Sequence, residues 1–330
     1  MQAIIDAKEL KRMFVDLRPI LKNSMDGGLL GFNVEDNQLI VTCKNGIIYE
    51  RKFACDVTGP IYSTVIYRDI ADMLPTEGLA VISVSEKSVE MRTSEFSTSF
   101  VAAYGEIRPY VRRCRDQKQC RQETYAKLAS AFRELSPVSK SLKSESSVIL
   151  HPPFAICKYP TIWLEVPFEG FSTSIGVREL RTIANFNPKY YAASDEAIEF
   201  FNGSALLAVP ISPVGDVLST KDILQNPQPP RQLSGLAPLE KALSFARTVK
   251  GACKLTYYTD GYKVTYKNQE VEMAFSVGPC MDPIYTLDTY TEYLQMLFRL
   301  TQDKTAYLTV ASNAIMIEVP GELRLIHSIV

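Results

Sequence analysis

The residues that most often carry acid–base or metal chemistry are scarce in this chain. Its 330 residues include two histidines, His151 and His327. Neither has the serine, aspartate or metal-spaced neighbours that a general base or a metal ligand needs. The sequence has no GxxxxGK[ST] loop or GxGxxG turn that could hold a nucleotide phosphate. We therefore expect no catalytic residue, no metal and no cofactor, and we predict that the protein is not an enzyme.

The seven cysteines indicate neither a metal site nor a disulfide framework. Only Cys114 and Cys120 lie close together, and no histidine pair accompanies them. The scatter of the cysteines through apolar segments predicts reduced, buried thiols. The composition is 46% hydrophobic and 22% charged, with no leader and no apolar run of roughly 20 residues. These features predict a soluble cytoplasmic protein that does not bind a membrane.

Phosphate binding is the chemistry that the cations could perform. The formal net charge is −1, so any attraction for nucleic acid must come from cations gathered on one surface. In the N-terminal helical stretch, at about 100° per residue, the cations lie opposite Leu10, Phe14 and Leu17. These cations are Lys8, Lys11, Arg12 and Arg18. A solvated helix face is the alternative interpretation, but only Glu9 and Asp16 oppose them.

Further cations fall on later helical stretches, and their distribution is uneven. The stretches near residues 124, 177 and 238 contain Lys127, Arg133, Arg178, Arg181, Lys241, Arg247 and Lys250. In the stretches near residues 67 and 289, acids offset the cations. A denser basic segment, residues 112–121, could contact phosphate or could equally be a solvated linker.

These helical stretches belong to a sixfold repeat. Apolar residues at three- and four-residue spacing mark helices that start near residues 7, 67, 124, 177, 238 and 289. The starts are separated by roughly 50 to 60 residues, a spacing typical of repeated units. Between the helices, short strands alternate with polar turns such as Asp260-Gly261. The repeating unit is therefore one helix with several antiparallel strands.

The six units combine in pairs. The segments that follow every second helix are 79–102, 189–212 and 304–330, and each has the pattern strand, polar turn, strand, polar turn, strand. Polar linkers begin near residues 108 and 212, and prolines in the second linker exclude a continuous helix. We predict three domains, at 1–112, 113–222 and 223–330.

Several segments resemble the DNA polymerase III β subunit, the bacterial sliding clamp. They are MQAIIDAKELKRMFVDLRPIL, GGLLGFNVEDNQLIVTCKNG, PLEKALSFARTVKG and ELRLIHSIV. The resemblance spans the chain and implies an α+β fold of three tandem clamp domains, with helices inside a ring and sheets outside it. Where the family's middle domain has a Thr-Asp-Gly-His-Arg-like turn, this chain has KYPTI at 158–162. This departure indicates a divergent member, or one encoded by a phage or mobile element.

The resemblance implies a non-catalytic processivity factor, a head-to-tail homodimer that encircles duplex DNA. Its helices would contact phosphates and not base edges, so binding would be independent of sequence. The matching cations are Lys8, Lys11, Arg12, Arg18, Lys127, Arg133, Arg178, Arg181, Lys241, Arg247 and Lys250.

The resemblance also implies that a DNA polymerase and a clamp loader insert short peptides into an apolar groove. The matching groove residues are Ile162, Trp163, Leu218, Ile315, Leu325, Ile326 and Ile329. Trp163 could instead be a core residue of its strand. Two other functions stay open: a toroidal structural or adaptor protein, such as a phage ring component outside replication, and an enzyme on a β-rich scaffold.

Overall fold

The structure, a computed structural model, divides into two compact units. Unit 1 contains residues 1–126 and 178–211, and unit 2 contains residues 127–177 and 212–330. The residues described are 2–21, 28–55, 60–114, 116–121, 123–134, 147–158, 161–215, 220–232, 252–267, 272–290, 293, 296, 300–301 and 304–328. Within this part of the chain, none of the helices has the length and apolar character that crossing a membrane requires.

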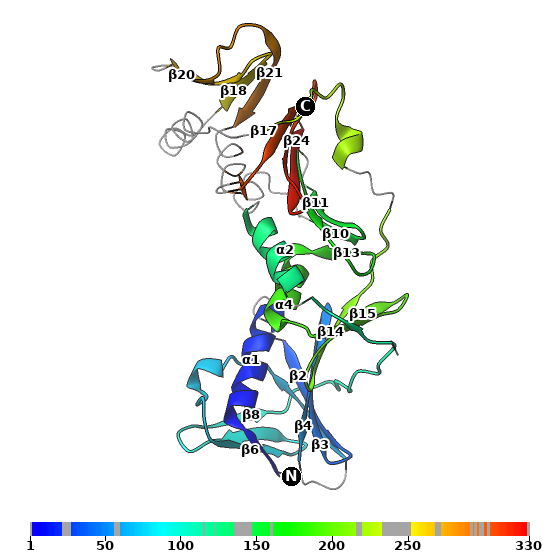
Figure 1. The fold of residues 1–330 in the computed structure, drawn as a ribbon. Helices are drawn as coiled ribbons and strands as arrows, with labels where there is room; N and C mark the ends of the chain where they lie inside the picture. Colours follow the sequence, from blue (N-terminus) through cyan, green and yellow to red (C-terminus); the bar gives the residue numbers. More distant parts are fainter. Residues whose placement is uncertain are drawn as a thin grey trace. The chain divides into compact units, whose positions relative to one another are not determined.

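Unit 1 contains two antiparallel sheets (Figure 1). The four-stranded sheet has the order β1 (Gln2–Asp6), β6 (Leu79–Val84), β7 (Ser88–Arg92) and β8 (Ser97–Val101). The eight-stranded sheet has the order β5 (Ile61–Ile66), β2 (Leu29–Glu35), β3 (Gln38–Asn45), β4 (Ile47–Ala54), β16 (Ala205–Pro210), β15 (Ala197–Asn202), β14 (Tyr190–Ala193) and β9 (Lys118–Gln119).

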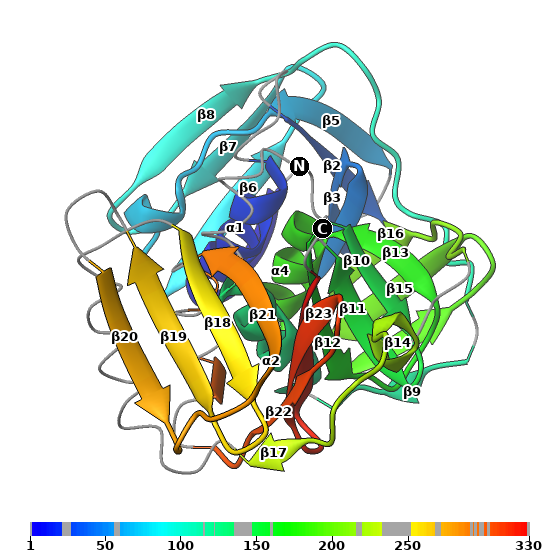
Figure 2. The same cartoon turned by 90° about the horizontal axis from the view of Figure 1, so that it is seen from above.

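Unit 2 repeats this plan (Figure 2). Its eight-stranded sheet has the order β13 (Thr173–Gly176), β10 (Ser147–His151), β11 (Phe154–Lys158), β12 (Ile162–Pro167), β24 (Leu323–Ser328), β23 (Ala314–Val319), β22 (Tyr307–Val310) and β17 (Arg231–Gln232). Its four-stranded sheet has the order β20 (Glu272–Val277), β19 (Tyr262–Lys267), β18 (Ala252–Tyr258) and β21 (Pro283–Tyr290). A short 3-10 turn, η2 (Thr220–Ile223), lies between β16 and β17.

Three of the predicted helices are confirmed near their expected starts: α1 (Ala7–Leu21), α2 (Glu123–Glu134) and α4 (Val177–Phe186). In α1 the apolar face that includes Leu10, Phe14 and Leu17 is fully buried. The Asp6 carboxylate caps the first turn by accepting from the Lys8 amide at 2.7 Å. The stretch expected near residue 238 lies outside the described residues, and in the last stretch residues 293, 296, 300 and 301 are helical.

The helix predicted near residue 67 is wrong. The chain forms only one 3-10 turn there, η1 (Ala71–Met73). Pro75 follows two residues later and cannot continue a helix. The turn buries Ile70 and Leu74 but leaves Met73 62% exposed. Apolar residues at helical spacing over only two turns were not enough to predict whether a helix forms.

The eight-stranded sheets arise from end-to-end pairing of four-stranded halves. Each half contains a meander of three consecutive strands, and in unit 1 the last strand of the β2–β3–β4 meander pairs antiparallel with the last strand of the β14–β15–β16 meander. In unit 2 the same relation joins β12 and β24. Both joints lie between segments that we assigned to different domains, so each joint makes one continuous sheet from two predicted domains. The boundaries near 112 and 222 stay a prediction.

The segment after β8 crosses one face of the eight-stranded sheet of unit 1. The Ile107 carbonyl passes so close to Gly31 that a Cβ there would lie 2.5 Å from its oxygen. Farther along, the amide of Tyr110 donates to Glu50 at 2.7 Å and the amide of Arg113 donates to Glu199 at 2.6 Å. Glu50 is on β4 and Glu199 on β15, so this connector spans the β4–β16 joint.

Candidate functional site

The solvent-facing stripe of α1 carries two of the predicted cations. Lys8, Arg12 and Val15 are exposed at helical spacing, opposite the buried face. The side chains of Lys8 and Arg12 form no hydrogen bond or ion pair with another described residue. They therefore keep their full donor capacity for an external anion such as phosphate.

The two acids of α1 pair with a buried arginine of the neighbouring sheet. Arg51, on β4, is 4% exposed and pairs with Glu9 through Nη2 and with Asp16 through Nη1 at 3.8 Å. The Tyr49 hydroxyl donates to Asp16 at 3.2 Å. Burial raises the pKa of Asp16 to about 6, against the opposing effect of Arg51. Both acids therefore have a cationic partner in Arg51, although Glu9 itself stays exposed, so less of their negative charge offsets the exposed stripe.

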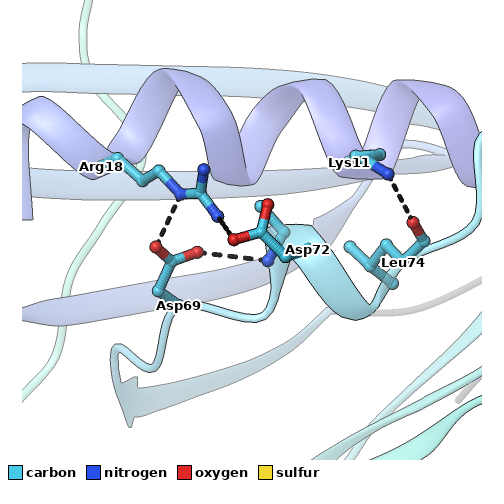
Figure 3. A network of polar contacts seen from close by, with 6 residues as sticks. Lys11, Arg18, Asp69, Asp72 and Leu74 are labelled. Atoms are coloured by element: carbon cyan, nitrogen blue, oxygen red, sulfur yellow. Dashed lines mark hydrogen bonds and ion pairs between the residues drawn. The ribbon is translucent and has the colours of Figure 1, made fainter.

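Lys11 and Arg18, the other predicted cations of α1, contact the segment around η1 (Figure 3). Lys11 Nζ donates to the Leu74 carbonyl at 2.8 Å. Arg18 pairs with Asp69 through Nε and with Asp72 through Nη2, both at 2.6 Å. These two side chains tie α1 to the 69–74 segment, and the two carboxylates neutralise the Arg18 charge.

The two arginines of α4 have different surroundings. Arg181 is exposed and makes no hydrogen bond or ion pair with a described residue. Arg178 reaches the C-terminal end of α1: Nη2 donates to the Ile20 carbonyl at 2.7 Å and to the Pro19 carbonyl at 3.2 Å. Arg178 Nε also donates to the Pro19 carbonyl, at 3.3 Å. Only Arg181 is thus fully available to an external anion.

The structure describes only some of the remaining predicted cations. Lys127 and Arg133 on α2 are both exposed. The predicted cations that lie outside the described residues are Lys241, Arg247 and Lys250.

The basic connector is paired with acids of the underlying sheet. Arg113 pairs with Glu196, and Arg112 lies 3.7 Å from Glu199 and 4.6 Å from the centre of the Phe201 ring. Of the two interpretations of this segment, the contacts favour a structural linker over a phosphate site.

A second candidate surface lies at the β12–β24 joint of unit 2. Trp163 is half-buried and stands opposite Ile326, which in turn stands opposite Met316 on β23. Lys158 Nζ lies 4.3 Å from the centre of the Trp163 ring. Leu224, which follows η2, packs against Met316 and Ile326. One sheet face therefore brings together two predicted groove residues and an apolar residue of the connector, and of the two groove residues Trp163 is half-buried and Ile326 is buried.

The other predicted groove residues are distributed differently. Ile162, Ile315 and Leu325 alternate with Trp163, Met316 and Ile326 along their strands, so they point to the opposite face. All three are fully buried there and belong to the core. The remaining two, Leu218 and Ile329, lie outside the described residues.

An ionic cluster that sequence patterns did not predict lies beside this surface. Arg324 on β24 donates to Glu165 on β12 and to Glu318 on β23, both at 2.7 Å. Glu165 is 1% exposed, so its charge depends on Arg324 for compensation. The only sequence signal was an acid within the apolar strand 162–166, and its partner is far away in the chain.

No protein-family model and no curated protein matches the sequence. Solved structures do match it over its full length. The DNA polymerase III subunit β from Pseudomonas aeruginosa has a TM-score of 0.77 at 12% identity, covering 100% of both chains. The Helicobacter pylori β clamp bound to a DNA ligase peptide has a TM-score of 0.71 at 11% identity, again with 100% of both chains covered. A likeness at this identity shows the fold.

Proposed function

From the fold of a bacterial β sliding clamp, we propose that this chain is a DNA sliding clamp. It acts as a non-catalytic processivity factor, a homodimer that encircles duplex DNA and tethers a replicative polymerase. The observation that carries the proposal is the rule by which the four-stranded sheet halves join. Two joints are made inside the chain, and two halves are left with an unpaired last strand.

The unpaired last strands are β8 and β20. Among the described residues, β8 pairs only with β7 and β20 only with β19, and just past β8 a single bridge joins Ala102 to Val65 of β5. At each internal joint, the last strand of the meander in the second half of one predicted domain pairs with the last strand of the meander in the first half of another. By the same rule, β8 of one copy pairs antiparallel with β20 of another. Two copies would then contain six eight-stranded sheets, four within the chains and two between them, and no last strand would stay open.

The exposed cations supply the affinity for DNA. Lys8 and Arg12 on α1 and Arg181 on α4 are exposed cations of these two helices that make no hydrogen bond or ion pair with a described residue, and they address phosphates without reading bases. The net charge of −1 adds no general attraction. Binding is therefore weak, strongly salt-dependent and maintained chiefly by encirclement.

Encirclement is tested with the same plasmid in closed circular and linear form. After mixing at low salt, the protein is chased with moderate salt and passed over a sizing column. We expect retention on the circle and loss after one double-strand cut, because a ring slides off a free end. Equal retention on both forms would refute encirclement.

The phosphate contacts are tested in the same assay with the double variant Lys8→Gln/Arg12→Gln. We expect retention to weaken and the salt slope to fall by about 2. The matched control is Arg92→Gln/Arg108→Gln, which removes two exposed arginines that already pair with Glu90 and Glu106. Equal loss in both double variants would show that net charge alone is responsible.

Partner binding is proposed at the Trp163 surface. The H. pylori neighbour binds a DNA ligase peptide, and here the half-buried Trp163 has the aromatic character of an interface anchor.

We expect Trp163→Ala to weaken binding of the cognate replicative polymerase about 30-fold, as loss of a roughly 2 kcal/mol hot spot predicts. Tyr104→Ala, at a fully exposed tyrosine of unit 1, is the control for aromatic loss. Unchanged co-elution of Trp163→Ala with polymerase would exclude this surface, whereas a wild-type protein that does not co-elute with polymerase would favour a role outside replication.

A further inference from the structure

We propose that Arg178 is a positioning residue, which fixes α4 to the C-terminal end of α1 so that their exposed cations act as one phosphate-binding surface. The proposal rests on the DNA-clamp function. It departs from the expectation that every solvent-facing cation of these helices contacts DNA. Three donor–acceptor contacts join Arg178 to the last turn of α1.

The chemistry of a helix end explains why Arg178 is held there. The last carbonyls of an α-helix have no partner within the helix and carry partial negative charge. A guanidinium offers several donors in a fixed plane and so satisfies two carbonyls at once. The amide group of Asn45, at the β3–β4 turn, donates to the same Ile20 carbonyl at 2.7 Å. The end of α1 is thus capped jointly by α4 and by the sheet.

A second contact holds the same two helices from below. The Tyr49 hydroxyl binds Asp16 of α1, and its ring meets the Phe186 ring of α4 edge-on, with centroids 6.3 Å apart. Tyr49 is fully buried on β4, and β4 is the strand at the joint with β16. The relation between α1 and α4 is therefore set by Arg178 at the surface and by Tyr49 in the core.

This placement gives the two arginines of α4 separate tasks. A phosphate beside Arg178 would also face the negative end of α1, and the guanidinium already donates to carbonyls there. Arg181, one turn along α4, makes no such contact with the described residues. The position of Arg181 relative to Lys8 and Arg12 then depends on Arg178.

Four variants separate positioning from direct contact: Arg178→Gln, Arg178→Lys, Asn45→Ala and Arg181→Gln. Each is measured for hydrogen exchange of residues 17–21 and for the salt dependence of DNA retention. Arg181→Gln should lower the salt slope by about 0.9 and leave exchange unchanged. Arg178→Gln and Asn45→Ala should both speed exchange several-fold and weaken retention several-fold, with the salt slope unchanged. Arg178→Lys, which can still donate to one carbonyl, should restore part of both effects.

The outcomes are distinguishable. If Arg178→Gln lowers the salt slope as Arg181→Gln does, Arg178 contacts DNA and the proposal is overturned. It is also overturned if exchange at the end of α1 stays at the wild-type rate. If wild-type protein shows no salt-dependent retention, the clamp function fails, and the exchange data alone decide whether Arg178 joins the helices.

Discussion

At the scale of single residues, the exposed face of α1 owes its charge to a side chain buried beneath it. Arg51 engages Glu9 and Asp16, the two acids that could have offset Lys8 and Arg12. A buried charge is tolerated only when it is paired, so Arg51 and its acids depend on each other. The positive stripe of α1 and the stability of the helix on the sheet are therefore linked through one network.

That network predicts a specific dependence of stability on pH. Burial raises the pKa of Asp16 to about 6, whereas the pKa of an unfolded aspartate is about 3.9. The folded chain then binds the proton more tightly, so stability increases as pH falls from about 6 towards about 4. Comparing wild type with Asp16→Asn by urea unfolding should reveal a wild-type gain on the order of 1–2 kcal/mol over this range. Other carboxylates titrate alike in both proteins, so parallel pH curves would show that Asp16 is not the group responsible.

At the scale of elements, the sequence was most informative where its patterns were local. Apolar periodicity predicted α1, α2 and α4, and alternation with polar turns predicted the strand triplets, because both periods follow from backbone geometry. The single turn η1 was predicted as a longer helix because two turns of apolar spacing ahead of Pro75 resemble the start of a helix. The β4–β16 and β12–β24 joints were not predicted because their strands are far apart in the chain.

The candidate site was predictable to a similar degree. Helical spacing correctly placed Lys8, Arg12 and Arg181 in solvent. It could not tell that Arg18 and Arg178 would be engaged, because their partners are acids and carbonyls of other segments. Solvent-facing position is thus a necessary condition for a phosphate contact, and the contacts with distant segments decide which cations remain available.

At the scale of the whole molecule, the joint between sheet halves governs assembly. Among the described residues, each internal joint pairs the last strands of two three-strand meanders, and β8 and β20 have this position without such a partner. Neither strand carries the lysine or proline by which edge strands commonly avoid association. Their open edges are therefore suited to specific pairing between copies.

The proposed pairing can be broken at one backbone amide of β8. The Thr93 amide donates to the Phe96 carbonyl and the Ala102 amide to the Lys87 carbonyl, so by ladder alternation the amide of Ser99 points away from β7. Ser99→Pro removes that amide without removing a bond to β7, a position at which an edge strand tolerates proline. We expect the dimer to weaken at least about tenfold by sedimentation, as loss of roughly 1.4 kcal/mol implies, while circular dichroism is unchanged. Ser99→Thr keeps the amide and should remain dimeric; a proline variant that dimerises as tightly as the wild type would place the contact on a different edge.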